Sequence, residues 1–297
     1  MTYSIVARDP ASGRFGVAIQ TCWPFVGAGC PWVESGVGAV ATQSFSEIAH
    51  GPNGLALLRS GVAAADALPR LLEPDPGRET RQVGIVDSAG RAASWTGSRC
   101  VEAAGHVTDE GVAIQANMME RPTVWPAMLA AWRVPAVSFV DRLLAALRAA
   151  EREGGDVRGR QSAVLIVSGT PDEPGWTRQF DVRVDDHPAP LDELERLVRL
   201  HLGYEALDRA EEAARQGEMD AAERASDDAS RLAPGDGQVL VWRALGMAAA
   251  GLIEPARAML AEAAGSNPRW PLFLRRFAES GAQPELVEAA RLLAASE

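Results

Sequence analysis

The segment TYSIVAR, residues 2–8, decides the fold that we expect, because an apolar strand begins at the second residue of the chain. The turn sequence DPASG, residues 9–13, then reverses the chain into a second apolar strand that ends at Thr21. A terminus that starts a core strand is held in place by its neighbours. The sequence therefore predicts a rigid N-terminus inside a sheet.

Thr2 is the candidate catalytic residue at this terminus. Its small side chain favours removal of Met1, which leaves a hydroxyl nucleophile and a free α-amine on one residue. An α-amine has a reference pKa of about 7.7 to 8.0, so a substantial neutral fraction acts as a base near neutral pH. A structural interpretation stays open, because Thr also favours strands for reasons unrelated to catalysis.

The composition limits the classes of partner. The chain has 297 residues, a net charge of −11 and a pI near 5.0, and it is long enough for two domains. An acidic chain lacks the clustered positive charge that nucleic acids or anionic membranes require. We find neither an apolar run of about 18 residues nor a basic region followed by an apolar stretch at the N-terminus. We therefore expect a cytoplasmic protein with a small-molecule partner.

The residue types also exclude several chemistries. All 29 basic residues are Arg, and no Lys occurs. Schiff-base chemistry, pyridoxal phosphate anchoring and the P-loop all require a Lys. The four His residues show no HExxH spacing, and Cys22, Cys30 and Cys100 lie far from any CxxC spacing. We therefore expect reduced thiols, no metal and no cofactor.

The segment GVGAVA, residues 36–41, matches the loose GxGxxA dinucleotide pattern but not its context. That fingerprint needs a strand before it and a helix that starts within it, whereas residues 38–43 are themselves typical of a strand. No GxSxG elbow is present either, which argues against an α/β-hydrolase.

Residues 1–200 alternate short apolar strands with helical blocks. Strands are predicted at 3–7, 14–21, 38–43, 82–86, 92–96, 111–115, 163–168 and 180–184. Helices are predicted at 54–60, 62–72, 124–132 and 138–153. Hairpins mixed with paired helices favour antiparallel sheets covered by helices over a doubly wound parallel sheet.

Residues 203–297 form a second, all-helical domain in our prediction. Small residues and a proline recur after 34 residues, namely Gly217, Ala222, Ala229 and Pro234, then Gly251, Ala256, Ala263 and Pro268. This spacing resembles tetratricopeptide repeats, in which small residues let two helices approach closely. The domain carries 16 acidic residues against 10 Arg, a net charge of −6. We expect it to bind a protein partner or to make the protein a homo-oligomer.

Polar residues inside apolar strands are the remaining candidates for a site, because their burial is costly unless they are paired or used. Asn117 and Gln115 can donate side-chain N–H groups to an oxyanion, and Gln43 can contact substrate. Arg8 and Arg183 can bind a substrate carboxylate through two hydrogen bonds. Asp185, in the acidic stretch DDH at 185–187, can orient the terminal amine. For each residue alone, a structural hydrogen bond remains the alternative.

Six segments together resemble a known bacterial and archaeal family. They are MTYSIVARDPASGRFGVAI, PWVESGVGAVATQ, GPNGLALLRSG, RQVGIVDSAGR, QANM and FDVRVDDHP, in this order. Over about residues 1–200 the chain is similar to the family called domain of unknown function 1028. The resemblance implies an N-terminal nucleophile hydrolase-like fold, a four-layer αββα sandwich, and it aligns Thr2 with the nucleophile of that fold. The proteasome branch of the fold uses a Lys that this chain lacks.

Two functional hypotheses follow. The first is an amidohydrolase that cleaves a C–N bond of a small amide or short peptide through an acyl-enzyme on Thr2. In this hypothesis Asn117 and Gln115 stabilise the oxyanion, and Asp185 and the arginines orient amine and substrate. The second is a non-enzymatic binding protein that keeps the sandwich and uses the helical domain for partners. Loss of Met1 favours the first hypothesis, and its retention favours the second.

Overall fold

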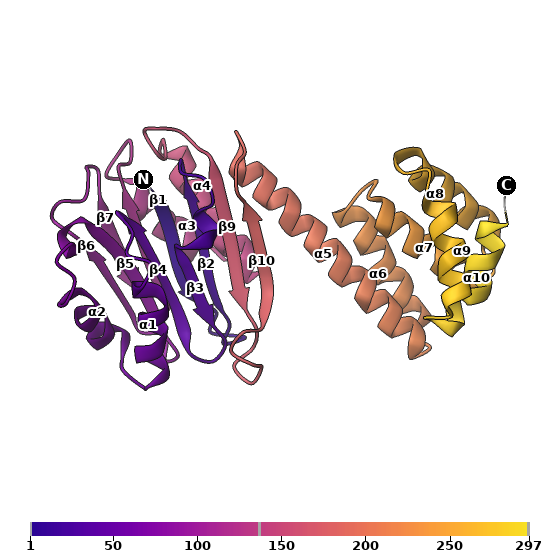
Figure 1. The fold of residues 1–297 in the computed structure, drawn as a ribbon, viewed down its shortest axis with the longest axis horizontal. Coiled ribbons are helices and arrows are strands. Elements are labelled where there is room, and N and C mark those ends of the chain that lie inside the picture. The colour runs from indigo at the N-terminus through magenta and orange to yellow at the C-terminus, as the bar shows by residue number, and fades with distance from the viewer. Residues whose placement is uncertain (1, 136–137, 296–297) are drawn as a thin grey trace. The chain divides into compact units, whose positions relative to one another are not determined.

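The computed structural model describes residues 2–135 and 138–295, whose order along the chain is traced in Figure 1. They form two compact units that divide between Arg196 and Leu197. Helix α5, Pro190–Arg215, runs through this division. The change in composition indicates a boundary at residues 200–203, but the helix continues beyond it to Arg215. The reason is that residues with high helix propensity precede and follow Gly203.

The first unit contains two antiparallel sheets, which confirms the preference for antiparallel pairing. Strands β10-β9-β2-β1-β8-β7 form one sheet, and β3-β4-β5-β6 form the other. The strands are β1 (Thr2–Arg8), β2 (Phe15–Thr21), β3 (Pro31–Glu34), β4 (Gly38–Ser44), β5 (Arg81–Asp87), β6 (Ala92–Thr96), β7 (Gly105–Asp109), β8 (Val112–Asn117), β9 (Ser162–Ser168) and β10 (Arg178–Val184). Strands β3 and β7 lie outside the strands predicted from the sequence, because they are short and only partly buried and so lack a clear apolar pattern.

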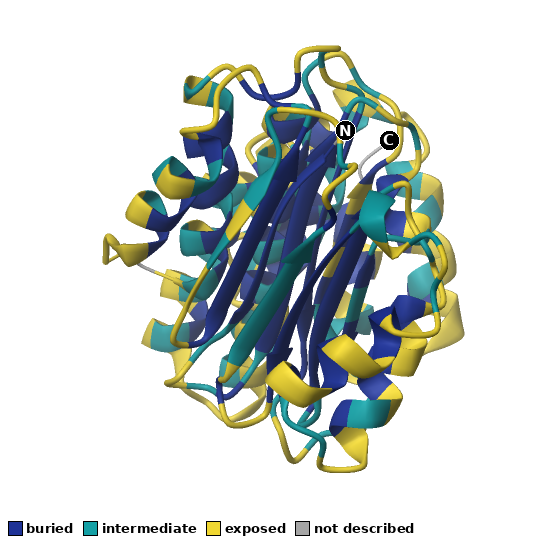
Figure 2. Cartoon of the chain, turned by 90° about the vertical axis from the view of Figure 1, so that its left-hand side faces the viewer, coloured by how far each residue is buried: buried dark blue, intermediate teal, exposed yellow. Residues whose placement is uncertain are grey.

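Helices pack on both sheets. They are α1 (His50–Arg59), α2 (Ala64–Leu72), α3 (Val124–Arg133) and α4 (Phe139–Arg152), with short 3-10 turns η1 (Val26–Ala28) and η2 (Arg78–Thr80). The apolar faces of α1 and α2 cover the four-stranded sheet, where Leu55 and Leu68 pack with Val40 and Ile85. Helices α3 and α4 contact β1, β2, β7 and β8 of the six-stranded sheet. Figure 2 shows largely buried strands with exposed residues on the helices and loops.

The two sheets face each other across an apolar core that includes Val6, Val17, Ala39 and Val86. Successive side chains of a strand point to opposite faces of its sheet. In β1 the even-numbered residues therefore face the other sheet, whereas Tyr3 faces α4 and bonds to Glu151 there. Thr2 consequently lies on the face of β1 that is enclosed between the sheets.

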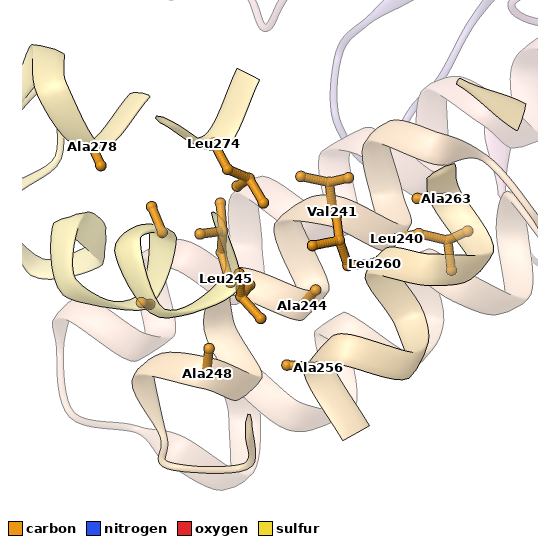
Figure 3. Close-up of a cluster of buried hydrophobic side chains, with 13 residues drawn as sticks. Leu240, Val241, Ala244, Leu245, Ala248, Ala256, Leu260, Ala263, Leu274 and Ala278 are labelled. Carbon is orange, nitrogen blue, oxygen red and sulfur yellow. The ribbon is translucent and has the colours of Figure 1, made fainter. Parts of the chain in front are cut away.

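The second unit is helical. After α5 it contains α6 (Met219–Leu232), α7 (Gly237–Ala249), α8 (Ile253–Ser266), α9 (Trp270–Ser280), the 3-10 turn η3 (Pro284–Leu286) and α10 (Val287–Ala294). Helices α6 and α8 begin and end 34 residues apart, and the repeated small residues Ala222, Ala229, Ala256 and Ala263 are buried. Leu245, Leu260 and Leu274 lie in its core, shown in Figure 3. No described helix of residues 2–135 and 138–295 is long and apolar enough to cross a membrane.

Candidate functional site

Thr2 is the first residue of β1, an interior strand of the larger sheet. It pairs with Thr21 of β2 on one side and with Asn117 of β8 on the other. Its side chain is buried, with a residue exposure of 5%, and its hydroxyl donates to Thr21 Oγ1 at 3.2 Å. The neighbouring strands therefore fix the candidate nucleophile on both sides, as its position in the sequence predicts.

Two amide side chains hold the main-chain oxygen of Thr2. Gln43 Nε2 donates to it at 3.2 Å, and Asn117 Nδ2 donates at 3.3 Å. The same two amides also donate to Gln82 Oε1, at 2.7 Å and 2.9 Å. All three amides are fully buried between the sheets. The structure thus brings Gln43 and Asn117 to Thr2, and it adds Gln82, which the sequence analysis did not select.

Asn117 offers an acceptor as well as a donor beside Thr2. Its Nδ2 is occupied by Thr2 and Gln82, whereas its Oδ1 is buried and has no hydrogen-bond partner within the described part of the chain. A buried acceptor without a partner is costly, by about 1 to 3 kcal/mol. This atom is therefore ready to accept a hydrogen bond from a nearby N–H group.

Gln115 lies deeper in the molecule, level with Ser4 on β1. Its Nε2 donates to Ser4 Oγ at 2.7 Å, and its Oε1 accepts from Ser94 Oγ at 3.2 Å. Gly84 of β5 packs directly against this amide, and a Cβ there would lie only 2.2 Å from it. The amide of Gln115 is therefore committed to joining the two sheets and is not directed at the hydroxyl of Thr2.

The structure does not bring Arg8, Arg183 or Asp185 to Thr2. Arg8 ends β1, six residues from Thr2 and therefore about 20 Å away. Asp185 follows β10, which is three strands from β1, a separation of about 14 Å. Arg183 pairs with Asp181 on its own strand, with Nε 2.6 Å from Oδ1. Sequence position alone does not reveal strand order, so the sequence cannot distinguish these residues from Asn117.

Asp156 is the acidic residue that lies at the start of β1. Its carboxylate accepts from the backbone N–H of Cys22 at 3.3 Å, and its backbone forms a bridge with Met119. Cys22 and Met119 continue the chain beyond the two strands that flank Thr2, so the segment bonded to both lies on the N-terminal side of Thr2. The side chain of Asp156 is completely shielded from solvent. It sits in a loop after Gly154-Gly155, where no sequence pattern marked it.

Cys22 lies next to Thr21 but is not suited to act as the nucleophile. Burial raises the pKa of its thiol, and the negative charge of Asp156 raises it further. A thiol with a raised pKa stays protonated near neutral pH, and the thiolate is the reactive form. Thr2 therefore remains the candidate nucleophile at this end of the sheet.

The backbone is in the left-handed region at the ends of two strands whose side chains hold Thr2, namely at the last residue of β4 and at the residue after β8. Ser44, directly after Gln43, has φ +70°, and Met118, directly after Asn117, has φ +57°. Such conformations are uncommon for residues other than glycine and cluster at functional sites. Both positions are tied into the fold, since Ser44 pairs with Arg81 of β5 and the N–H of Met118 donates to Val101 O at 3.1 Å.

Two cavities open on the first unit. One, of about 590 Å³, is lined by His50, Asn53, Arg70 and Asp75 among others. The other, of about 490 Å³, is lined by Thr96, Cys100, His106 and Trp125 among others. Neither is lined by Thr2. In residues 2–135 and 138–295, no group of three or more His, Cys, Asp or Glu side chains is arranged to hold a metal ion.

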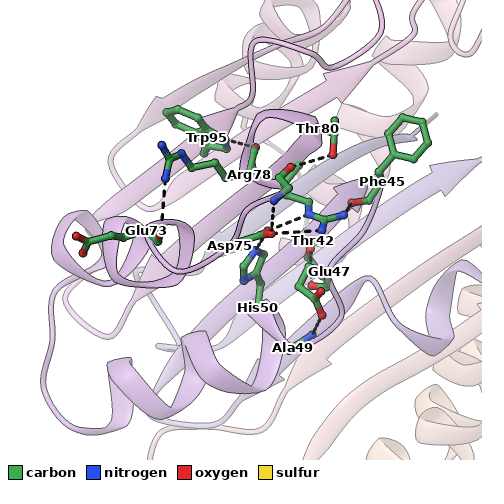
Figure 4. Close-up of polar contacts among 12 residues, drawn as sticks. Thr42, Phe45, Glu47, Ala49, His50, Glu73, Asp75, Arg78, Thr80 and Trp95 are labelled. Atoms are coloured by element: carbon green, nitrogen blue, oxygen red, sulfur yellow. Dashed lines mark hydrogen bonds and ion pairs between the residues drawn. The ribbon is translucent and has the colours of Figure 1, made fainter.

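His50 and Asp75 form a buried pair beside the larger cavity, shown in Figure 4. His50 Nε2 lies 3.1 Å from Asp75 Oδ2, and Arg81 Nε donates to the same oxygen at 2.9 Å. Arg81 also donates to Phe45 O at 2.6 Å. The hydrogen bonds from Arg81 lower the pKa of Asp75 to about 2, despite its burial. These contacts join the start of α1 to the loops after α2 and β4, so they have a structural role.

A family model described as Family of unknown function (DUF1028) matches residues 2–194. The chain belongs to this family. The match confirms the family resemblance of the sequence, and it ends before the helical unit, which begins at Leu197.

Solved structures include a second DUF1028 protein, from Silicibacter pomeroyi. It is 34% identical, with a TM-score of 0.61, and the alignment covers 67% of this chain and 88% of that one. The ancestral beta-subunit Anbu from Yersinia bercovieri aligns over 65% of this chain and 90% of its own, with 11% identity and a TM-score of 0.32. The comparison with curated proteins gave no match.

Proposed function

We propose that this DUF1028 protein is an amidohydrolase of the N-terminal nucleophile type, acting on a C–N amide bond of a small metabolite or short peptide. The observation that carries the proposal is the position of Thr2 at the very start of a buried interior strand, with its hydroxyl enclosed between the sheets. Removal of Met1 creates an amine on the same residue as this hydroxyl. In the proposal, the two facing sheets with helices on their outer faces are the four-layer αββα sandwich of that hydrolase fold.

The reaction proceeds through an ester on Thr2. Its Oγ1 attacks the carbonyl carbon of the amide, and the α-amine takes the hydroxyl proton. Collapse of the tetrahedral intermediate breaks the C–N bond, and the same proton passes to the leaving nitrogen. Water then attacks the ester, with the α-amine again as base, and releases the carboxylic acid. No cofactor is needed, because every proton transfer uses the amine and water.

The structure changes which neighbours we assign to this reaction. Asn117 keeps its place beside Thr2, where its Oδ1 is an acceptor for the α-amine. Both N–H groups of its Nδ2 are already bonded, to Thr2 O and to Gln82 Oε1, so we no longer assign Asn117 as the oxyanion donor. We assign the orienting role to Asp156, because it bonds to Cys22 and bridges Met119, which follow the two strands that flank Thr2, whereas Asp185 follows a strand three strands away. Gln43 and Gln82 act as positioning residues by holding the main chain of Thr2.

The binding hypothesis has its own support. The hydroxyl of Thr2 is almost inaccessible and bonded to Thr21, and Thr2 lines neither cavity. A protein that retains Met1 would keep this closed arrangement and lack the terminal base. In that case the family scaffold binds a ligand without cleaving it, and the helical unit recruits the partner.

For the helical unit we propose tetratricopeptide-like repeats. The equal lengths and the 34-residue offset of α6 and α8 support this assignment, as do the buried alanines at matching positions. Helical pairs of this kind bind protein segments or a second copy of themselves. We propose a cytoplasmic homo-oligomer in which this unit carries the protein contact.

The deciding experiment measures the intact mass of the purified full-length chain before and after an electrophilic acylating probe. The proposed function requires a mass that lacks Met1, and it requires the probe to modify the peptide that begins at Thr2. Probe on Cys22, Cys30 or Cys100 in place of Thr2 contradicts the proposal. Full retention of Met1 supports the binding hypothesis.

A further inference from the structure

Large apolar side chains are exposed around the end of the sheets where Thr2 lies. We call this set the apolar rim, and its members are Trp23, Phe25, Phe45, Ile48, Val101 and Val157, each between 47% and 68% exposed. The other exposed large apolar residues described in this unit, Val134 and Trp176, lie toward the Arg8 end. Single exposed apolar residues are ordinary on a protein surface, whereas a gathered set marks a binding surface.

The loop after β2 contributes two members of the rim. Trp23 follows Thr21, the partner of Thr2, by two residues, and its main-chain oxygen accepts from Ser162 Oγ at 2.5 Å. Phe25 follows, with its N–H bonded to Asp185 O at 3.0 Å. Trp23 is therefore fixed by a bond to the start of β9, and Phe25 by a bond to the residue that follows β10.

The loop after β4 contributes two more. Phe45 comes two residues after Gln43, whose amide holds the main chain of Thr2. Ile48 packs against Gly29, where a Cβ would lie 3.1 Å from Ile48 Cδ1. Because Gly29 belongs to the loop after β2, this contact places the two loops side by side.

The remaining two members are joined to the end of β8. The main-chain oxygen of Val101 accepts from the N–H of Met118 at 3.1 Å, and the N–H of Val157 donates to Met118 O at 3.4 Å. Met118 directly follows Asn117, the partner of Thr2. The rim thus comes from four separate loops. Each of these loops follows, or is hydrogen-bonded to, the end of a strand that lies beside Thr2.

Phe25 is held outward by its backbone. Its φ of +61° is in the left-handed region, which is uncommon for an aromatic residue. Its N–H and its carbonyl oxygen are both used, the latter by the N–H of Ala28 at 3.0 Å. A strained conformation that keeps an apolar ring in solvent is costly unless the ring is used. Exposure of this ring is therefore a built feature of the loop.

We propose that the apolar rim binds the acyl part of the substrate, and that the substrate class is amides with a long apolar acyl chain. The inference rests on the proposed function, which places the carbonyl carbon at Thr2. A ligand whose carbonyl group is bound at Thr2 lies next to the strand ends that these four loops follow or bind. Its acyl chain can therefore contact the apolar side chains that the loops carry. Glu102 and Arg158 follow Val101 and Val157 and give this apolar surface a charged border.

The test uses p-nitroanilides of acetic, hexanoic and decanoic acid with the full-length protein. Binding is measured by calorimetry on Thr2→Ala, which cannot turn the probes over and keeps a small residue after Met1. We expect affinity to rise about two- to fourfold for each added methylene. Phe25→Asn in this background should weaken decanoyl binding by about tenfold and leave acetyl binding unchanged, because one aromatic contact is lost.

The controls separate the rim from general effects. Asn adopts the left-handed conformation readily, so Phe25→Asn should melt at the temperature of the parent. Trp176→Ser removes an aromatic side chain that is 79% exposed at the other end of the sheets, and it should leave binding unchanged. Val157→Thr provides a second rim variant, with a smaller loss for the decanoyl probe.

The outcomes are distinguishable. Affinity independent of chain length, or equal losses for Phe25→Asn and Trp176→Ser, overturns the inference. If the affinity of Thr2→Ala rises with chain length but the wild type releases no nitroaniline, the rim binds acyl chains and the amidase proposal is wrong. If the wild type hydrolyses short and long probes equally well and Phe25→Asn does not change this, the amidase proposal stands and the rim does not bind the acyl chain. A rim variant that turns a dimer into a monomer in sedimentation, with unchanged affinity, assigns the surface to a second copy and also overturns the inference.

Discussion

The hydroxyl of Thr2 lies 3.2 Å from the hydroxyl of Thr21, its partner across β1 and β2. Thr21 is almost fully buried, so the pair lies inside the sheet structure and away from solvent. Thr21 thus fixes the rotamer of the candidate nucleophile. This relationship makes Thr21 a positioning residue in the proposed reaction, and it can be tested without touching Thr2.

Thr21→Val should lower kcat by about 10- to 100-fold while changing the melting temperature little, because the shape is kept and only the orienting hydroxyl is lost. Steady-state kinetics on an amide substrate and a thermal melt check both parts. Thr108→Val on the exposed side of β7 is the matched control and should have wild-type kinetics. Wild-type kcat in Thr21→Val would show that this hydrogen bond does not position the nucleophile.

Thr2→Ala should abolish amide hydrolysis and leave the fold nearly intact, since no large core volume is lost. Thr2→Ser keeps a hydroxyl and should retain measurable activity, which distinguishes loss of the nucleophile from loss of packing. Product release and far-ultraviolet circular dichroism measure the two effects. Activity in Thr2→Ala equal to that of the wild type would end the acyl-enzyme proposal.

Asp156→Asn should shift the pH dependence of catalysis. In the proposed site the buried carboxylate stabilises the protonated form of the α-amine, so removing the charge lowers the pKa of the amine. The ascending limb of the kcat/KM profile should therefore move to lower pH. Asp185→Asn, three strands away, is the control and should keep the wild-type profile. An unmoved limb in Asp156→Asn, in a protein that remains folded, contradicts the assignment.

Asp75 should make the first unit sensitive to acid. Hydrogen bonds from Arg81 hold its pKa at about 2, below the usual value of 3.8. Because the folded-state pKa is lowered, the ionised carboxylate contributes stability above about pH 4, and this contribution is lost as the pH falls toward 2. Urea unfolding between pH 6 and pH 2.5 should show this loss in the wild type.

The matched variants locate that effect. Asp75→Asn should be less stable than the wild type at pH 6 and should lose less stability on acidification. Asp66→Asn, at an exposed position on α2, should follow the wild-type curve. Parallel curves for Asp75→Asn and the wild type would assign the acid sensitivity to other carboxyl groups.

Truncation after Leu202 should leave a folded and soluble first unit, because each unit has a hydrophobic core of its own. The truncated protein should keep any hydrolysis of small amides and lose the partner or the self-association assigned to the helical unit. Thermal melts and sedimentation of both lengths measure this. An insoluble truncation, or one that melts far below the whole chain, would show that α5 and the helices after it complete the fold.

Local patterns in the sequence determined the first strands and the family. The apolar run at residues 2–8 and the turn at residues 9–13 appear as β1, β2 and the hairpin between them. The period of 34 residues appears as the equal spacing of α6 and α8. Periodicity and turn residues act over a few positions along the chain, so they can be recognised without knowledge of distant contacts.

Strand order and register, which only the tertiary structure decided, selected the neighbours of Thr2. Gln43 and Asn117 come together because β4 and β8 end at the same level as β1 begins. Arg8 lies at the other end of β1, and Asp185 follows a strand three strands away, although the sequence does not distinguish them from Asn117. Asp156 can be assigned to the candidate site only from its bonds to segments that flank β1. Pairings between distant strands depend on the packing of the whole sheet, and no local pattern in the chain encodes them.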